Sequence, residues 1–494
     1  MKTIIAAGVA LLMSLNVDAV SQETTVSTGK DTKKTSITVY NGGFGLVREQ
    51  RMMNLKSGMN DVRFEDVASQ IDPTSISFKS MSFPSSLSVR EQNYQYDLLN
   101  PTSILNKSVG KTVRFRRMLG NGQSETIEGT LLNPPTTVVA DGSYNSSMNY
   151  NGLVIKTKDG KVLLNPTGEV LVDELPTGLL PVPSLLWKLY CNKPGQHETE
   201  VAYTTNGINW NADYVALVND DESKVDITGW VTLDNKSGAM YKDAQLQLVA
   251  GDVRRVQNHT ISLSALTAGV TYNNEGAFKA APEFHEESFF EYHLYTLDGT
   301  TTINNNETKQ MQLMNANNVS VKRKLIFDSA KPTYVSSRGG GQATDELKAN
   351  VIVEVKNSQD NNMGMPLPKG KVRMYKNDKR GNVQFLGEDE TDHTPKDETL
   401  RLYIGDAFDV VATRKQTDVK QLGDRSNEMS YEVTVRNRKE TSTDVYILEH
   451  FWGEWEVTKN NAKFNKLDAR SLEFPITLAK GESKTITFTV RTRW

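Results

Sequence analysis

Short runs in which apolar and polar residues alternate recur along most of this chain, and they constrain its fold more than any other feature. Clear examples are 213–218 (DYVALV), 225–233 (VDITGWVTL) and 244–251 (AQLQLVAG). Successive side chains of a strand point to opposite faces, so a period of two predicts strands with one buried face. We therefore expect an all-β protein of tandem antiparallel β-sandwich (immunoglobulin-like) domains, with a small N-terminal β unit and a small β-barrel-like domain.

The chain is too long for one compact core, because its 494 residues exceed the size at which single cores stop growing. Residues 1–19 combine Lys2, an apolar run and a small-residue site ending at Ala19, which is typical of a secretory signal peptide. The further divisions that we expect are a flexible tether over 20–35, the N-terminal β unit over 36–98, the barrel-like domain over 99–183, a central sandwich over 184–330 and a C-terminal sandwich region over 331–494. One or two helical turns are expected in the proline-rich boundary 179–195, and a long mobile loop over 265–284.

These features predict an exported protein of the periplasm, cell surface or extracellular space. A net charge of −3 argues against a nucleic-acid partner, and no long apolar run after residue 19 predicts a membrane-spanning segment in the mature chain. Cys191 is the single cysteine, so no internal disulfide is available. It is either a nucleophilic thiol or a small buried hydrophobe, and its setting in LLWKLYC favours the second.

The densest charge cluster of the sequence lies at 387–398, in GEDETDHTPKDE. It contains Glu388, Asp389, Glu390, Asp392, Asp397 and Glu398 around His393, with only Lys396 in compensation. Carboxylate oxygens are the ligands that Ca²⁺ and Mg²⁺ prefer, so a structural Ca²⁺ is a candidate here, and no other cofactor is expected. The alternative is a solvated corner between two strands, stiffened by Thr394-Pro395 and followed by a break at Gly405-Asp406. The candidate binding residues are Glu388, Asp389, Asp392, His393, Asp397 and Asp406.

A second metal candidate is the pair Glu291 and His293 in SFFEYHLYTL. Read as one continuous strand, this run puts both side chains on the same face, at a spacing from which they could reach one ion. The alternative is the polar outer face of a strand, next to Tyr295. No H-E-x-x-H motif, cysteine cluster or EF-hand loop accompanies the pair.

Several phrases in the second half of the chain together resemble one known family. They include NGINWNADYVALV, GWVTLDNKSGAMYKDAQLQLVAGDV, MGMPLPKGKVRMYK and GEDETDHTPKDETLRLYIGDAFDV. Over about 198–494 the chain resembles the bacterial domain-of-unknown-function family 4139, which is mucoidy-inhibitor-like. The segment 37–78 is similar to the region that often precedes this domain. The resemblance implies an exported β-rich protein and brings no catalytic residues with it.

No complete catalytic signature is present. There is no G-x-S-x-G elbow, and Ser108 with Lys111 forms an S-x-x-K pair without its companion motifs. Trp452 and Trp455 could stack on sugars, but their spacing puts at least one in a core. A terminal aromatic residue, here Trp494, is typical of outer-membrane barrels. Arg491 and Arg493 of the last strand favour a terminal strand of a sandwich instead.

Two functions therefore remain open. The first is a non-catalytic binding or assembly module of the bacterial cell envelope, whose partner is an envelope protein or a glycan. The second is a secreted hydrolase of envelope or dietary polymer, with the acidic segment around His393 as its site.

Overall fold

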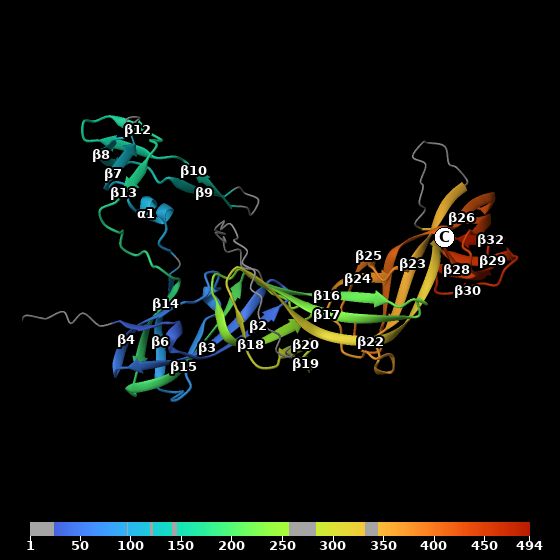
Figure 1. Ribbon diagram of the computed structural model, residues 1–494, viewed down its shortest axis with the longest axis horizontal. Coiled ribbons are helices and arrows are strands. Elements are labelled where there is room, and N and C mark those ends of the chain that lie inside the picture. Colours follow the sequence, from blue (N-terminus) through green and yellow to red (C-terminus); the bar gives the residue numbers. More distant parts are fainter. Residues whose placement is uncertain (1–23, 96, 119–121, 141–145, 256–282, 331–343) are drawn as a thin grey trace, which may run out of the picture.

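The computed structural model describes residues 24–95, 97–118, 122–140, 146–255, 283–330 and 344–494. Within these ranges nearly every regular element is a strand, which confirms the predicted all-β fold (Figure 1). The predicted signal peptide and nearly all of the loop predicted for 265–284 lie outside the described residues. No helix in the described ranges has the length and apolar character needed to cross a membrane.

Two sheets form an N-terminal sandwich. The first has the order β1-β4-β14-β6, with β1 (Thr25–Ser27), β4 (Gly58–Glu65), β14 (Ser184–Cys191) and β6 (Leu87–Gln95). The second contains β19 (Phe284–Phe289), β20 (Tyr292–Leu297), β18 (Tyr241–Ala250), β2 (Thr32–Tyr40), β3 (Phe44–Leu55), β15 (Gly195–Asn206) and β5 (Ser77–Ser80) in that order, and β21 (Thr301–Ile303) pairs with β18. Trp187 fills the space between the sheets and packs against Phe64 and Phe78.

Strand pairing divides the chain differently from the predicted boundaries. The proline-rich boundary contains strand β14 instead of helical turns, because Leu185, Trp187, Leu189 and Cys191 alternate with outward-facing residues and are buried. β14 pairs with both β4 and β6, so it completes the N-terminal sandwich. The structure from Thr25 onward differs from the flexible tether predicted for 20–35. That segment contains β1, the 3₁₀ turn η1 (Gly29–Asp31) and the start of β2.

The residues between β6 and β14 form a separate small unit, seen at the upper left of Figure 1. Helix α1 (Pro101–Lys107) precedes an open sheet of the order β12-β11-β8-β7-β13. Its strands are β7 (Thr112–Met118), β8 (Ser124–Leu131), β11 (Val154–Thr157), β12 (Val162–Leu164) and β13 (Glu169–Leu171). The hairpin of β9 (Thr136–Ala140) and β10 (Ser146–Tyr150) lies between β8 and β11 in the chain. The two ends of the unit meet at a bridge between Leu98 and Leu180.

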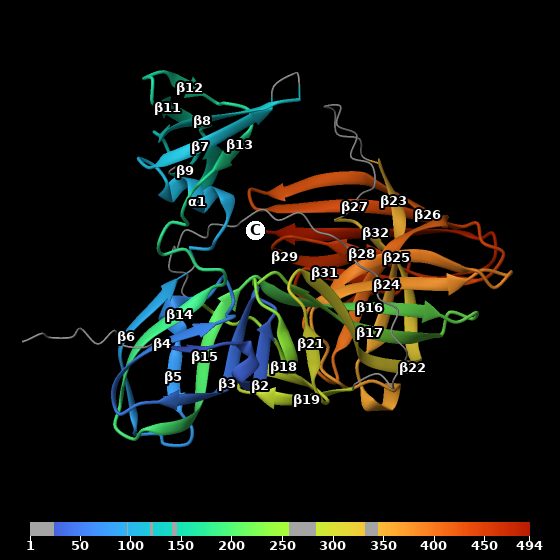
Figure 2. The same ribbon diagram turned by 60° about the vertical axis from the view of Figure 1, so that its left-hand side comes forward.

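The third large sheet runs through the centre of the molecule to its C-terminal end (Figure 2). Its main path is β25 (Val383–Thr391), β24 (Gly370–Asn377), β16 (Ile208–Val218), β17 (Lys224–Asn235), β22 (Glu307–Asp328), β23 (Thr344–Lys356), β26 (Thr399–Gly423), β27 (Ser426–Asn437), β32 (Ser483–Arg493) and β29 (Glu454–Asn460). β28 (Thr443–His450), β31 (Ser471–Leu478) and β30 (Asn465–Lys466) complete the C-terminal sandwich, and the 3₁₀ turns η2 (Pro73–Ser75) and η3 (Gln359–Asn361) lie in connections.

Two large hydrophobic cores stabilise the sandwiches and the third sheet, and a smaller third core lies in the unit between β6 and β14. One is shared by the N-terminal sandwich and the central part of the third sheet, and the other fills the C-terminal sandwich. β22, β23 and β26 contribute residues to both cores, so the same strands pass from one to the other. Trp455 packs against the C-terminal core while Trp452 is exposed, as their spacing predicts. β32 lies between β27 and β29, which agrees with a terminal sandwich strand.

Candidate functional site

The first acids of the predicted site lie on a strand. Glu388 and Asp389 belong to β25, whereas the sequence places them in the connection that follows it. Glu388 lies opposite Arg373 of β24 in the strand register, and its carboxylate is 3.2 Å from Arg373 Nε and 3.6 Å from Lys371 Nζ. Cross-strand pairing with basic residues offsets the like charge of the acids and lets the strand extend through them.

Asp389 connects β25 to β26, and Asp406 connects β26 to β23. Asp389 Oδ2 accepts the backbone N–H of Tyr403 at 2.7 Å, although β25 and β26 share no strand ladder. Asp406 Oδ1 accepts from Asn350 Nδ2 at 2.8 Å and from the Tyr403 hydroxyl at 3.0 Å. Burial, together with Asp406, raises the pKa of Tyr403. These two carboxylates therefore link β26 to both neighbouring elements, and Asp406 also lines a cavity of about 220 Å³.

His393 lies at a corner where distant parts of the chain meet. Its Nδ1 accepts the backbone N–H of Lys369 at 3.2 Å, and its Nε2 is 3.4 Å from Nδ2 of Asn41, in the turn between β2 and β3. Burial lowers the pKa of His393, and the Lys369 ammonium and His293 act in the same direction. The carboxylates of Asp252 and Asp392 oppose that shift. The ring thus joins the N-terminal sandwich to the acidic corner and is held in its neutral form.

This geometry predicts an acid-sensitive contact. The neutral ring accepts the Lys369 N–H, whereas a proton on Nδ1 would set two N–H groups against each other. Since the folded pKa lies below the unfolded one, the contribution of His393 is complete above about pH 6.5 and is lost as the pH falls through the folded pKa. We expect denaturant titrations at pH 7.5 and 5.5 to show a larger loss of stability in the wild type than in His393→Gln. Equal losses in the two proteins would contradict this assignment.

Asn357 is a residue that the sequence analysis missed. Its side chain is fully buried and donates from Nδ2 to the carbonyl oxygens of Met365 at 2.9 Å and Pro395 at 3.0 Å. Its Oδ1 accepts the N–H of Gly364 at 2.9 Å, and its backbone C=O accepts the N–H of Asp397 at 2.7 Å. Asn357 therefore fastens the loop 362–369 to the acidic corner, and Asp397 acts there through its backbone, in a left-handed turn conformation.

A weak internal repeat in the sequence could have pointed to Asn357. VTLDN, VEVKN and VTVRN end at Asn235, Asn357 and Asn437, each of which is fully buried at the end of a strand. Asn235 donates to the carbonyl oxygens of Ala239 and Asn304, and Asn437 to those of Thr441 and Ala479. The amide side chain thus satisfies buried backbone groups in three different connections.

Glu291 and His293 do not share a strand face. β19 ends at Phe289, Phe290 takes a positive φ of 57°, and β20 starts at Tyr292, so the run is a hairpin with Glu291 in its turn. His293 Nδ1 is 2.7 Å from Oε1 of Glu286 across the hairpin. The expectation that the two side chains share a strand face is therefore wrong, and a metal ion at this pair stays a prediction. Throughout the described ranges, no three His, Cys, Asp or Glu side chains are grouped to hold a metal ion.

Cys191 is buried in the N-terminal core beside His197 and Ser80. Its Sγ is 3.6 Å from His197 Nε2, but that nitrogen is only 2.7 Å from the carbonyl oxygen of Lys193, to which Sγ also donates at 3.1 Å. Ser80 Oγ is 3.0 Å from Nδ1 of the same ring. The histidine is therefore engaged on both nitrogens, and the site has the contacts of a packed core, as the apolar setting of Cys191 predicts.

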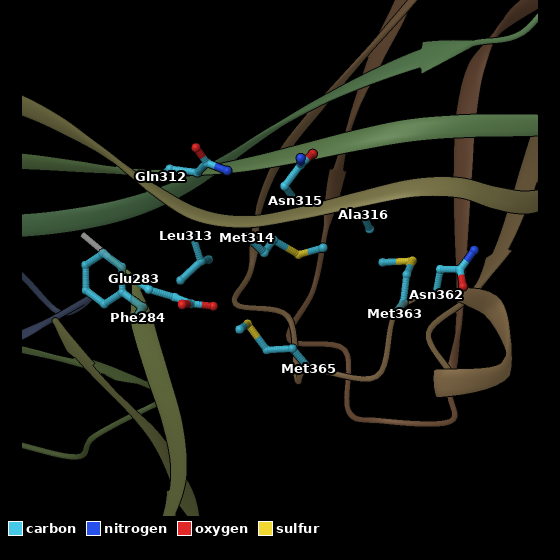
Figure 3. A pocket seen from close by; sticks show the side chains of 10 residues that line it. All are labelled: Glu283, Phe284, Gln312, Leu313, Met314, Asn315, Ala316, Asn362, Met363 and Met365. Carbon is cyan, nitrogen blue, oxygen red and sulfur yellow. The ribbon is translucent and has the colours of Figure 1, made fainter. Parts of the chain in front are cut away.

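The loop 362–369 also closes a cavity of about 400 Å³, shown in Figure 3. Met314 comes from β22, Met363 and Met365 come from the loop, and their side chains project into the space that Glu283 and Phe284 border on the other side. The buried Tyr295 and Tyr214 fix the loop by donating to the carbonyl oxygens of Pro366 and Pro368, each at 2.8 Å.

The wall that β22 contributes is a strand edge. β17 pairs with one edge of β22 over Glu307–Ser320, whereas β23 pairs with the other edge only from Val321 onward. Asn361 and Asn362 cover part of that second edge by bonding to the backbone of Ser320, Asn317 and Asn318. From 311 to 316 no described strand pairs with it, so an open edge faces the methionine-lined cavity.

A comparison with curated proteins finds no match. The sequence model of one family, described as Domain of unknown function (DUF4139), matches residues 199–494. This range begins within β15 and includes the acidic corner, the loop 362–369 and every strand of the third large sheet. The match confirms the resemblance seen in the sequence phrases and covers more than half of the chain. The protein therefore belongs to the DUF4139 family.

Proposed function

We propose that this protein is an exported, non-catalytic binding or assembly module of the bacterial cell envelope, which holds an extended segment of a partner protein at the open edge of β22. The observation that carries the proposal is that edge, next to the methionine-lined cavity. The sequence pattern of residues 1–19 supports export.

Open strand edges favour the addition of another strand. Unpaired backbone N–H and C=O groups form a template for an extended peptide, and proteins normally cover or shorten such edges. Here Asn361 and Asn362 cover the edge at 317–320 but leave 311–316 open. Six residues extend about 20 Å, which is enough for a short strand to pair along the cavity wall.

The cavity provides a place for an apolar side chain of that segment. Met314, Met363 and Met365 are half-buried and pack against the main core. Unbranched thioether side chains adapt to differently shaped ligands and are common at surfaces that bind several partners. Glu283, Gln312 and Asn315 supply polar groups among the lining residues. Main-chain pairing would give affinity, and the cavity would select the side chain.

The acidic corner supports binding better than hydrolysis. Glu388 pairs with Lys371 and Arg373, Asp389 accepts the backbone N–H of Tyr403, and His393 Nδ1 accepts the backbone N–H of Lys369. A general base must face the substrate proton that it removes. The loop 362–369 joins this corner to the cavity, so the acids serve to position the binding wall.

Photo-crosslinking in the native envelope would test the proposal. A photoreactive residue at Met314 is expected to join one defined segment of a partner protein, whereas the same residue at the exposed Met118 of the small unit should not. The segment, made as a synthetic peptide, should then slow hydrogen exchange of the backbone amides at 311–316. Met314→Lys should weaken peptide binding by about tenfold or more, because it buries a charge in the cavity, and Met118→Lys should not.

Three outcomes would overturn the proposal. The products could be the same at both positions, the peptide could bind without protecting 311–316, or Met314 could be joined only to glycan. The last outcome would place a sugar polymer at the cavity instead of a protein strand.

A further inference from the structure

The segment 29–35 forms one wall of a second cavity, far from the acidic corner in sequence. This cavity measures about 620 Å³, and its opposite wall is the segment 238–243 at the start of β18. The Lys-rich stretch that resembles a tether in the sequence is therefore a built surface in the fold.

The cavity exists because β18 separates from β2 at this point. The two strands are paired from Ser36 with Gln245 to Tyr40 with Val249. Before Gln245, β18 turns to β21 and pairs with it through Tyr241 and Ala244. The beginning of β2 thus faces a gap in the sheet instead of a neighbouring strand.

Four lysines surround this gap: Lys30, Lys33, Lys34 and Lys242. None of them forms an ion pair with any residue that the structure describes. The register of β2 against β3 shifts between Thr32 and Lys34, so Lys33 lies in a bulge. A bulge re-aims side chains that would otherwise alternate, which accounts for the adjacent Lys33 and Lys34 both lining the cavity.

The carboxylates that line the cavity are already engaged. Glu49 is buried and bonds through Oε2 to Arg51 Nη2 at 2.6 Å and to Arg51 Nε at 3.1 Å. Asp66 accepts the N–H of Gly29 at 2.9 Å, and Asp243 accepts from the Thr302 hydroxyl at 3.4 Å. Five cationic side chains, the four lysines and Arg51, thus face three carboxylates, and the net charge of the lining is positive although the whole chain carries −3.

Arg51 is a lining residue whose side chain is fixed by its contacts. Its side chain is 1% exposed, donates to the carbonyl oxygens of Ser27 at 3.1 Å and Glu65 at 2.9 Å, and stacks on the ring of Phe64 with Cζ 3.6 Å from its centre. A buried guanidinium fixed by these contacts does not move to meet a ligand. The four lysines, by contrast, are exposed.

We propose that this cavity binds a phosphate group carried by a larger molecule. A concave, positively charged site with several unpaired ammonium groups selects a multiply charged oxyanion over a single carboxylate. The cavity is larger than one phosphate requires, so the ligand brings a further polar group that Thr32 and Thr35 can contact. This site is separate from the β22 edge, and the inference does not depend on the proposed function.

Pyrophosphate, measured by calorimetry at low salt with the full mature chain, is the first probe. Lys33→Gln combined with Lys34→Gln is expected to weaken its binding at least about tenfold, and Lys242→Gln to weaken it further. The matched control is Lys459→Gln with Lys463→Gln, which removes the same charge from exposed positions elsewhere. Thermal melting of each variant shows that the fold is intact.

Vesicles of phosphatidylglycerol in phosphatidylcholine form the second arm and distinguish the source of the phosphate. Binding of pyrophosphate without binding of vesicles indicates a soluble phosphorylated ligand. Vesicle binding that Lys33→Gln/Lys34→Gln abolishes and pyrophosphate competes away indicates a lipid headgroup. Equal weakening by the test and control pairs, or no binding of either probe, would overturn the inference.

Discussion

Replacing Asn357 with alanine is expected to lower the free energy of unfolding by about 3–5 kcal/mol. The change leaves the N–H of Gly364 and the carbonyl oxygens of Met365 and Pro395 without their buried partner. Each buried polar group that loses its hydrogen bond costs about 1–3 kcal/mol, which is more than an ordinary hydrogen bond contributes. The loss should appear as a lower midpoint in urea denaturation, followed by circular dichroism.

Asn350→Ala is the matched control for this substitution. Asn350 lies on β23, the strand that ends just before Asn357, but its amide makes an exposed hydrogen bond with Asp406. We expect it to cost less than about 1 kcal/mol. Similar losses in the two variants would mean that the buried amide does not organise the loop. Asn357→Ala should also weaken binding of the peptide at Met314, because the loop 362–369 forms part of that cavity.

Arg414→Met is expected to destabilise the C-terminal sandwich by about 3–5 kcal/mol, since it leaves the buried carboxylate of Glu449 without its partner. Glu449 has no exposed surface, and its two oxygens lie 2.9 and 3.2 Å from Arg414 Nε. The guanidinium also stacks on Tyr431, with Cζ 4.1 Å from the ring centre. Burial raises the pKa of Glu449 even though Arg414 opposes this shift, which shows the desolvation that the pair must overcome.

The double variant Arg414→Met/Glu449→Leu separates lost charge pairing from lost packing. It removes both charges, so we expect it to recover most of the stability of the wild type. Arg491→Met is the surface control, because Arg491 pairs with Glu428 and Glu456 in solvent, and it should change stability by less than about 1 kcal/mol. Calorimetric melting of the four proteins measures these effects. A double variant as unstable as Arg414→Met would show that packing dominates.

The alternation of apolar and polar residues was sufficient to predict the strands, because that pattern is local. It placed the strands around Val215, Val231 and Leu246 correctly, and it predicted one exposed and one packed tryptophan at 452 and 455. Local pattern could not show which strands pair. β2 pairs with β18 more than 200 residues away, as the register of Ser36 with Gln245 shows. The N-terminal sandwich therefore divides the chain differently from the predicted boundaries.

The candidate site was predicted less well, because its contacts come from distant parts of the chain. His393 was singled out, but its neighbours Asn41 and Lys369 carry no signal near it in the sequence. The hairpin turn at Phe290 requires a positive φ in an aromatic residue, so no turn motif marked it and Glu291 was assigned to a strand. The lysines at 30–34 lie in a stretch without alternation, and only the gap between β2 and β18 gives them a common cavity.

β22 and β26 are 22 and 25 residues long, and each contributes residues to both cores, although the pairing of β26 with β23 shifts its register around Gly405 and Asp406. At about 3.3 Å per residue, such strands extend for roughly 70–80 Å. A protease therefore finds no linker in these strands where the two cores could be separated. A force applied to one end of the molecule would be transmitted to the other end through the backbone of these strands and their interstrand hydrogen bonds. The two cores would therefore bear a mechanical load together, and a partner strand added at the edge of β22 would share that load.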